Sequence, residues 1–145
     1  MHFWDTSALA KLYVSEPDSP AFKAHVVFTG TVHASELVRW ELFRVLARKE
    51  ADGVLASGST ESVFARFQGV IAQGNILLAP LSEDVEARFR QLVLRVHRQS
   101  QGVLVRTSDA IHIATALLHG AVGFAVTDTT MRKGATAAGL TLFPN

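Results

Sequence analysis

The stretch FWDTSALA, residues 3–10, places a carboxylate at the junction between a predicted strand and a predicted helix. Phe3 and Trp4 are typical of the end of a short strand, and Ala8 and Leu9 of the beginning of a helix. Asp5 lies between them, beside two hydroxyl residues. Similar junctions follow at VRTSDAIHIATAL (105–117) and FAVTDTTM (124–131). The chain therefore carries three aspartates in similar local settings.

Around these junctions, strand-like segments alternate with segments of helical periodicity, which is typical of an α/β protein with a mostly parallel sheet. The expected strands are His2–Trp4, Thr31–His33, Asn75–Leu78, Ala121–Thr127 and Leu140–Phe143. The expected helices are Ser7–Val14, Pro20–Phe28, Ser35–Ala51, Thr60–Gln73, Glu83–Arg98, Ser108–His119 and Thr129–Ala138. The segment VLVRTS (103–108) fits either a strand or a loop that leads into a helix.

The composition indicates one compact domain over residues 1–145, of which 48% are hydrophobic. The lack of cysteine excludes disulfides, thiolate chemistry and cysteine-based zinc sites, and the six histidines do not form an HExxH motif. A formal net charge of +1 gives no bulk attraction to nucleic acid. Without a signal-like segment or a run of about 18 apolar residues, we expect a cytoplasmic protein that makes no membrane contact.

Two of the three aspartates follow predicted strands. In open parallel sheets, ligands bind beyond the C-terminal strand ends, so Asp5 and Asp128 are candidates for one shared site. The alternative for each is a helix N-cap. Asp109 lies in a first helical turn behind the potential cap Ser108, and the helix dipole favours an acid there as well. His112, one turn later, could contact Asp109, although a lone histidine is more often a packing or hydrogen-bonding residue than a metal ligand.

Glu41 is harder to explain as a capping or surface residue. It lies on or beside the apolar stripe of the helix predicted from Ser35, which consists of Val38, Leu42, Val45 and Leu46. An unpaired carboxylate there is costly, so we expect Glu41 to be paired, hydrogen-bonded or bound to a cation. Glu36 lies about 140° away around the helix, and we expect it to be solvated and paired with Arg39.

Together, these acids suit a hard divalent cation. Mg²⁺ and Mn²⁺ prefer oxygen ligands, and such sites support phosphoryl chemistry. If the four carboxylates converge, the metal-free fold would hold like charges close together, which would raise the apparent pKa of the group.

In order and spacing, these segments resemble the PIN-domain family, and within it the VapC-type toxins of prokaryotic toxin–antitoxin pairs. The matching stretches are FWDTSALAKLY (3–13), SELVRWELFRVLAR (35–48), RTSDAIHIATALLHG (106–120) and AVTDTTMRKGATAAGLTLF (125–143). The resemblance implies a three-layer α/β/α domain and metal-dependent endonuclease activity on RNA. It places the acidic, catalytic site on Asp5, Glu41, Asp109 and Asp128. Ser7 is then a supporting residue and Thr127 a neighbour of the site.

One position departs from the family pattern. Family members often have Thr or Ser two residues before the last acid, where this chain has Val126, with Thr127 adjacent to Asp128 instead.

The implied chemistry is hydrolysis of RNA by a water that a bound Mg²⁺ activates, with Mn²⁺ able to substitute. Four basic residues near the acidic junctions are candidates for phosphate contacts, although each is also explained as a solvated surface residue. They are Lys11, Arg106, Arg132 and Lys133. As a VapC-like toxin, the protein is expected to bind a VapB-like antitoxin and to form a homodimer.

Two other interpretations stay open at this point. A phosphatase of the haloacid-dehalogenase type would use Asp5 as a nucleophile, but that chemistry needs a second acid two residues later, where this chain has Ser7. A non-catalytic metal- or phosphate-binding module would hold an ion without cutting RNA.

Overall fold

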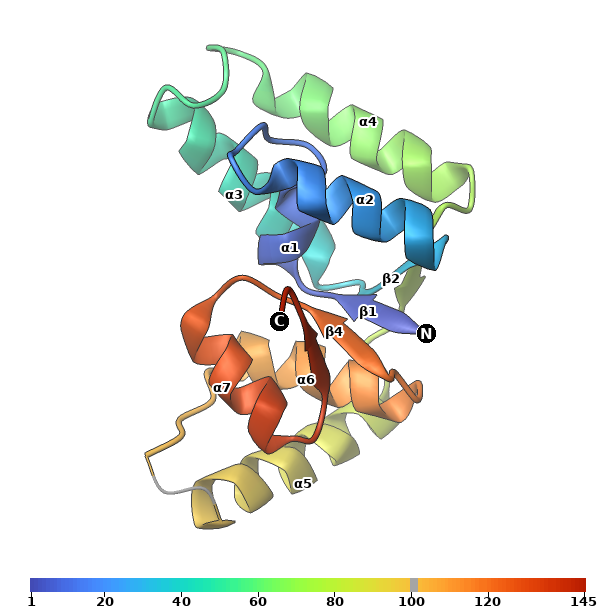
Figure 1. The fold of residues 1–145 in the computed structure, drawn as a ribbon, viewed down its shortest axis with the longest axis vertical. Coiled ribbons are helices and arrows are strands. Elements are labelled where there is room, and N and C mark those ends of the chain that lie inside the picture. The colour runs from blue at the N-terminus through green and yellow to red at the C-terminus, as the bar shows by residue number, and fades with distance from the viewer. Residues whose placement is uncertain (100–101) are drawn as a thin grey trace.

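A sheet of parallel strands forms the centre of the computed structural model, which describes residues 1–99 and 102–145 (Figure 1). The strand order is β3-β2-β1-β4-β5, and every pair of neighbours is parallel. The strands are β1 (His2–Trp4), β2 (Val32–Ser35), β3 (Ile76–Ala79), β4 (Gly123–Ala125) and β5 (Thr141–Phe143). The α/β class is confirmed, and the sheet is parallel throughout the described residues.

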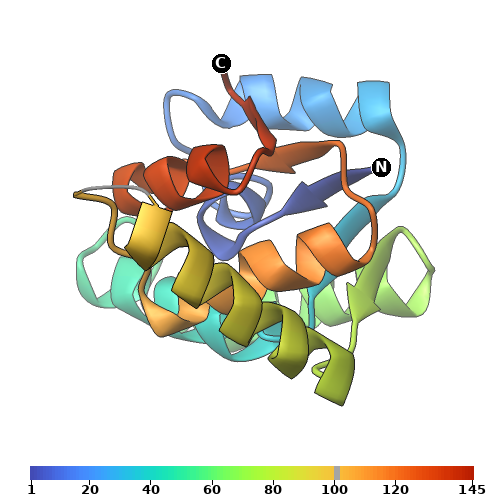
Figure 2. The ribbon, with the colours of Figure 1, turned by 90° about the horizontal axis from the view of Figure 1, so that it is seen from below.

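Helices cover both faces of this sheet, which gives the expected three layers (Figures 1 and 2). One layer holds α1 (Thr6–Ala10), α2 (Ser19–Thr29), α3 (Val38–Ala51) and α4 (Thr60–Ala72). The other holds α5 (Glu83–Gln99), α6 (Thr107–Leu118) and α7 (Thr129–Ala137). None of these helices, within residues 1–99 and 102–145, has the length and apolar character needed to cross a bilayer.

The side chains of β1 fill the cores on both faces, because successive residues of a strand point in opposite directions. Trp4 is fully buried in the cluster that α1–α4 form over the sheet, together with Phe22. Phe3 is buried in the cluster under α5–α7 and stacks on Phe124 of β4, with the ring centroids 6.3 Å apart. The first strand is therefore held by packing on both faces.

The central position of β1 creates a topological switch point. From β1 the chain continues to β2 on one side, and β4 lies on the other side. The Asp5 N–H donates to the Ala125 carbonyl over 3.0 Å, which continues the pairing one residue beyond β1. In parallel sheets such a switch point leaves a crevice at the carboxyl ends of the strands. The segments that follow β1 and β4 both begin there, as the sequence predicts.

Several predicted helix boundaries shift in the structure. Helix α1 ends at Ala10 instead of Val14, and a turn follows it. Helix α3 begins at Val38 because Ser35 is still part of β2, in register with Ala79 of β3.

In the ambiguous segment 103–108, residues 103–106 form a loop and the last two residues already belong to α6; none of the six is in a strand. The N-cap position of α6 is Arg106, so the expectation that Ser108 caps this helix is wrong. The loop is anchored instead by Val105, whose side chain lies against Gly134 of α7.

Substitution of Leu42 tests how much the packing of α3 against the core contributes to the stability of the fold. Leu42→Ala should lower the free energy of unfolding by roughly 2–5 kcal/mol, because it leaves a cavity in a fully buried site. Leu94 on α5 is 50% exposed, and Leu94→Ala should cost less than about 1 kcal/mol. Urea denaturation followed by circular dichroism measures both. Equal losses in the two variants would contradict the packing described for α3.

Candidate active site at the carboxyl edge of the sheet

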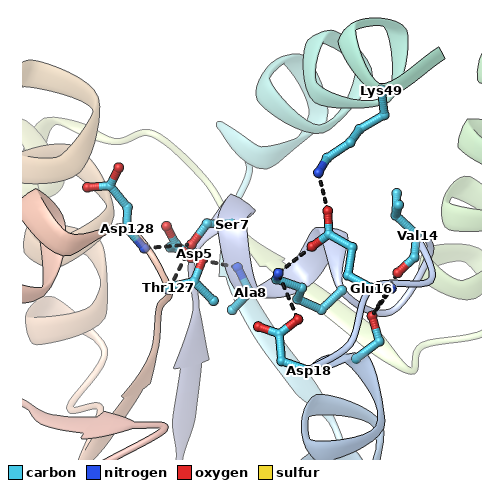
Figure 3. A network of polar contacts seen from close by, with 11 residues as sticks. Asp5, Ser7, Ala8, Val14, Glu16, Asp18, Lys49, Thr127 and Asp128 are labelled. Atoms are coloured by element: carbon cyan, nitrogen blue, oxygen red, sulfur yellow. Dashed lines mark hydrogen bonds and ion pairs between the residues drawn. The ribbon is translucent and has the colours of Figure 1, made fainter. Parts of the chain in front are cut away.

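Asp5 occupies the centre of the site, directly after β1. It is 4% exposed and is the N-cap residue of α1. Its Oδ1 atom accepts hydrogen bonds from the Ala8 N–H (2.9 Å) and the Ser7 hydroxyl (2.7 Å). The Ser7 oxygen in turn accepts from the N–H of Thr127 (2.9 Å), at the end of the β4 segment (Figure 3). Ser7 thereby ties the segment after β1 to the segment after β4.

Asp128 has the same local geometry at the neighbouring strand end. It is the N-cap residue of α7, and its Oδ1 accepts from the Met131 N–H over 2.8 Å. Figure 3 shows Asp128 beside Asp5 and Ser7. Both aspartates are therefore helix caps, as the alternative interpretation predicts, and they also lie at one edge of the sheet. Capping uses Oδ1 in each case.

Glu41 approaches the site from the first turn of α3. Its Oε2 atom accepts a hydrogen bond from the Thr6 hydroxyl and is 2.7 Å from Nε2 of His112 on α6. The expectation that Glu41 is paired on the apolar side of its helix is confirmed. His112 is 1% exposed and is a hydrogen-bonding residue, but it contacts Glu41 and not Asp109. Sequence reasoning missed this pair, whose only signal is a histidine on an apolar helix face.

Asp109, in the first turn of α6, is buried and bound by an arginine. Its Oδ2 accepts from Nε of Arg106 over 2.7 Å, and Nη2 of the same guanidinium donates to Oδ1 of Asp128 over 2.8 Å. The structure thus places Arg106, a candidate phosphate contact, between two of the four acids.

The other three candidate phosphate contacts have different surroundings. Lys11 forms ion pairs with Glu16 and Asp18, the latter at 2.9 Å. Arg132 donates to two backbone carbonyl groups, of residues 126 and 144. Lys133 is exposed on α7. Lys11 and Arg132 are therefore already engaged in holding the chain together.

Glu36 does not lie on the helix that the sequence predicts for it. Because α3 begins at Val38, Glu36 belongs to the turn before the helix, and its carboxylate accepts the Leu81 N–H over 2.8 Å. The predicted pair with Arg39 is wrong for this reason. The distinction between Glu36 and Glu41 holds, since only Glu41 contacts Thr6 and His112.

The surroundings of the acids shift their pKa values in different directions. Burial raises the pKa of Asp5 to about 6, against the opposing effects of the His112 charge and the Ala8 N–H. Burial acts most strongly on the pKa of Glu41 and raises it, but the hydrogen bond and charge of His112, together with hydrogen bonds from Thr6 and Ser108, outweigh burial and leave the pKa below its usual range. For Asp128, burial is outweighed by the Met131 N–H and by Arg106, so its pKa is lowered. The rise at Asp5 comes from burial, and not from the mutual repulsion of carboxylates that the sequence predicts.

The donor chemistry fits Mg²⁺ or Mn²⁺, because the four acids supply oxygen ligands. The bonds from Ala8, His112, Arg106 and Met131 each fall on one oxygen of their carboxylate: Asp5 Oδ1, Glu41 Oε2, Asp109 Oδ2 and Asp128 Oδ1. Within residues 1–99 and 102–145, however, no group of three histidine or acidic residues is assembled in a geometry that could hold an ion. The chain thus has oxygen ligands of the type that Mg²⁺ prefers, but in this structure the guanidinium of Arg106 bridges two of them, Asp109 and Asp128.

The family model for the PIN domain matches residues 3–136, nearly the whole chain. The chain belongs to the PIN-domain family. A search among curated proteins finds no match.

Solved structures share this fold, and one of them is described as a toxin. FitAcB from Neisseria gonorrhoeae is 23% identical, with a TM-score of 0.70 over 99% of this chain and 96% of that chain. VapC20 from Mycobacterium tuberculosis, described as a sarcin-ricin loop cleaving toxin, is 17% identical, with a TM-score of 0.69 over 97% of each chain. VapBC2 from Rickettsia felis, solved with a DNA fragment from its promoter, is 13% identical, with a TM-score of 0.69 over 97% of this chain and 96% of that chain.

The burial of Asp5 predicts a pH-dependent stability difference. Its pKa is about 6 in the fold, against 3.8 ordinarily, so between these values the folded state keeps a proton that the unfolded state has lost. The wild type should therefore lose stability relative to Asp5→Asn as the pH rises from about 4 to 7, by roughly 3 kcal/mol. Asn keeps the cap, so the cap itself does not contribute to this difference.

Urea denaturation of both proteins at several pH values, in metal-free buffer, measures the difference. Parallel stability profiles for wild type and Asp5→Asn would show that Asp5 has an ordinary pKa in the fold.

Proposed function

We propose that this PIN domain is a metal-dependent endoribonuclease and the toxin of a toxin–antitoxin pair. The observation that carries the proposal is the arrangement of four acids around the carboxyl ends of β1 and β4, in a chain of this family. They are Asp5, Glu41, Asp109 and Asp128. VapC20, which shares the fold, is described as a toxin that cleaves the sarcin-ricin loop.

In this proposal the four carboxylates hold Mg²⁺, or Mn²⁺ in its place. The ion supplies Lewis acidity and an activated water for phosphodiester hydrolysis. The Ser7 hydroxyl and the Ala8 N–H both donate to Oδ1 of Asp5, and these two bonds restrain the orientation of the whole carboxylate. Thr6 and His112 do the same for Glu41. These partners orient ligands in the way that outer-shell hydrogen bonds do at metal sites in general.

RNA contacts would come from basic residues beside these four acids. Lys133 is exposed on α7, the helix that Asp128 caps, and the side chain of Arg106 is 56% exposed while it bridges the acids. Lys11 and Arg132 would contribute only by giving up the bonds they make in the fold. Aromatic stacking motifs are lacking in the sequence, so we expect substrate choice to rest on RNA shape and groove contacts.

The phosphatase alternative is less well supported. The place of its second acid is taken by Ser7, whose hydroxyl is fully used between Asp5 and Thr127. A non-catalytic binding module stays distinguishable by experiment, since it would hold the ion without cutting RNA.

We also propose an antitoxin partner and a homodimer. FitAcB and VapBC2, which share the fold, carry the names of toxin–antitoxin complexes. On this chain, Trp40 and Phe43 of α3 are 62% and 41% exposed, and they line a surface pocket with Phe64 of α4. An apolar segment of an antitoxin would bury these rings. Light scattering of the isolated protein tests the homodimer.

Cleavage should depend on metal and on Glu41. Purified protein should cut RNA with Mn²⁺ or Mg²⁺, and excess EDTA should stop it. Glu41→Gln should lower the rate by roughly a hundredfold or more, because the charge that helps to hold the ion is lost. Glu36→Gln is the matched control and should keep most activity, since its hydrogen bond to the Leu81 N–H needs only a neutral oxygen.

Gel assays on total RNA and on a synthetic sarcin-ricin stem-loop measure these rates. Cleavage that persists in EDTA would defeat the metal mechanism, and equal effects of the two substitutions would remove Glu41 from the site. Mn²⁺ binding without cleavage would favour the binding module.

The aromatic pocket should be part of the antitoxin interface. When the protein is co-expressed with the product of a small adjacent gene, Trp40→Ala should weaken the complex by about tenfold or more, as truncation of an interface tryptophan typically does. Phe28 on α2 is 84% exposed and does not line this pocket, so Phe28→Ala is the control. Calorimetric titration of the purified partners measures both. Identical affinities for wild type and Trp40→Ala would place the antitoxin elsewhere.

A further inference from the structure

The guanidinium of Arg106 is shared between two helices of the proposed metal site. Nε donates to Asp109 on α6, and Nη2 donates to Asp128 at the start of α7, at 2.7 and 2.8 Å. Two different nitrogens of the planar guanidinium bind the two carboxylates, so the group bridges Asp109 and Asp128. A lysine ammonium is a point charge and lacks this fork.

Packing fixes the backbone that presents Arg106. Val105 lies against Gly134 of α7, where an added Cβ would come within 3.2 Å of its Cγ2 atom. The N–H of Val105 also donates to Nε2 of His97 over 3.3 Å. The Arg106 side chain itself is 56% exposed, while that of Asp109 is 8% exposed. The base of the arginine is therefore held in place, while its guanidinium has solvent into which it can move.

Arg106 neutralises charge where a metal ion would do the same. The guanidinium engages Oδ2 of Asp109 and Oδ1 of Asp128, and these two carboxylates are half of the proposed ligand set. A divalent cation bound by both carboxylates would repel the guanidinium and compete for the same oxygens. Among residues 1–99 and 102–145, Arg106 is the basic residue that forms ion pairs with Asp109 or Asp128. The competition therefore centres on one side chain.

We infer that Arg106 is an internal counter-ion that closes the site in the metal-free protein and must leave Asp109 and Asp128 when a divalent cation binds. The inference rests on the proposed function, because it takes these acids as metal ligands. Removing the arginine should loosen the metal-free fold and strengthen metal binding at the same time. A merely structural ion pair predicts only the loss of stability.

Calorimetric titration with MnCl₂ at constant ionic strength tests this on the full chain. Arg106→Ala should bind Mn²⁺ roughly 5- to 30-fold more tightly than the wild type, which corresponds to the loss of two partly exposed ion pairs. Its melting temperature without metal should fall, and the rise on adding Mn²⁺ should exceed that of the wild type. Arg90→Ala is the matched control. It removes one arginine and its ion pair with Glu86 on α5, and should leave Mn²⁺ affinity within about twofold.

Arg106→Gln is measured in parallel, so that a folding defect in the alanine variant does not decide the result. Unchanged or weaker Mn²⁺ binding by the folded Arg106 variants would overturn the inference. If the wild type binds Mn²⁺, and Asp109→Asn and Asp128→Asn weaken that binding, the proposed metal site survives such a result. If neither wild type nor Arg106 variants bind Mn²⁺, the inference and the metal-dependent function fail together.

Discussion

The position of the four acids depends on how β1 is held, because this strand is fixed both within the sheet and by the cores on its two faces. It pairs with β2 and β4 in the plane of the sheet, while Phe3 and Trp4 are buried in the cores on opposite faces. Asp5 is the next residue, and its N–H continues the pairing to β4. Its carboxylate therefore follows a strand that is paired on both edges and packed on both faces, which is how a scaffold holds a functional group in place.

Carboxylates that are buried, such as Asp5 and Asp109, or partly buried, such as Glu41 and Asp128, lose hydration, and this fold supplies hydrogen bonds to them in separate ways. Asp5 accepts from a backbone N–H and from Ser7, and Glu41 accepts from Thr6 and His112. The remaining two acids share Arg106. Hydrogen bonds to ionised groups are among the stronger ones in proteins. The metal-free protein can therefore fold with four acids near one another, without relying on an ion to neutralise them.

The same contacts set a condition on the proposed chemistry. The hydroxyls of Ser7 and Thr6 carry no charge, and each donates to one oxygen of a carboxylate. Arg106 is different, because its positive charge would repel a metal ion that shares its carboxylates. Stability of the metal-free fold and affinity for metal are thus opposed at Arg106, and aligned at the hydroxyl donors Ser7 and Thr6. A substitution at this one position would therefore change the balance between metal-free stability and metal affinity without altering the acids.

Alternating strands and helices, read from hydrophobic periodicity, determine the α/β class and the location of each acid on its element. The sequence also determines that Asp5 and Asp128 follow strands, and that Glu41 needs a partner, because these properties depend on neighbours along the chain. Only the tertiary structure decides which partner that is. His112 and Arg106 reach their carboxylates from segments 71 and 22 residues away, across helix and loop packing that local patterns do not encode. The helix start at Val38, and with it the surroundings of Glu36, is likewise decided by pairing of Ser35 with β3, a contact that forms only when distant strands align.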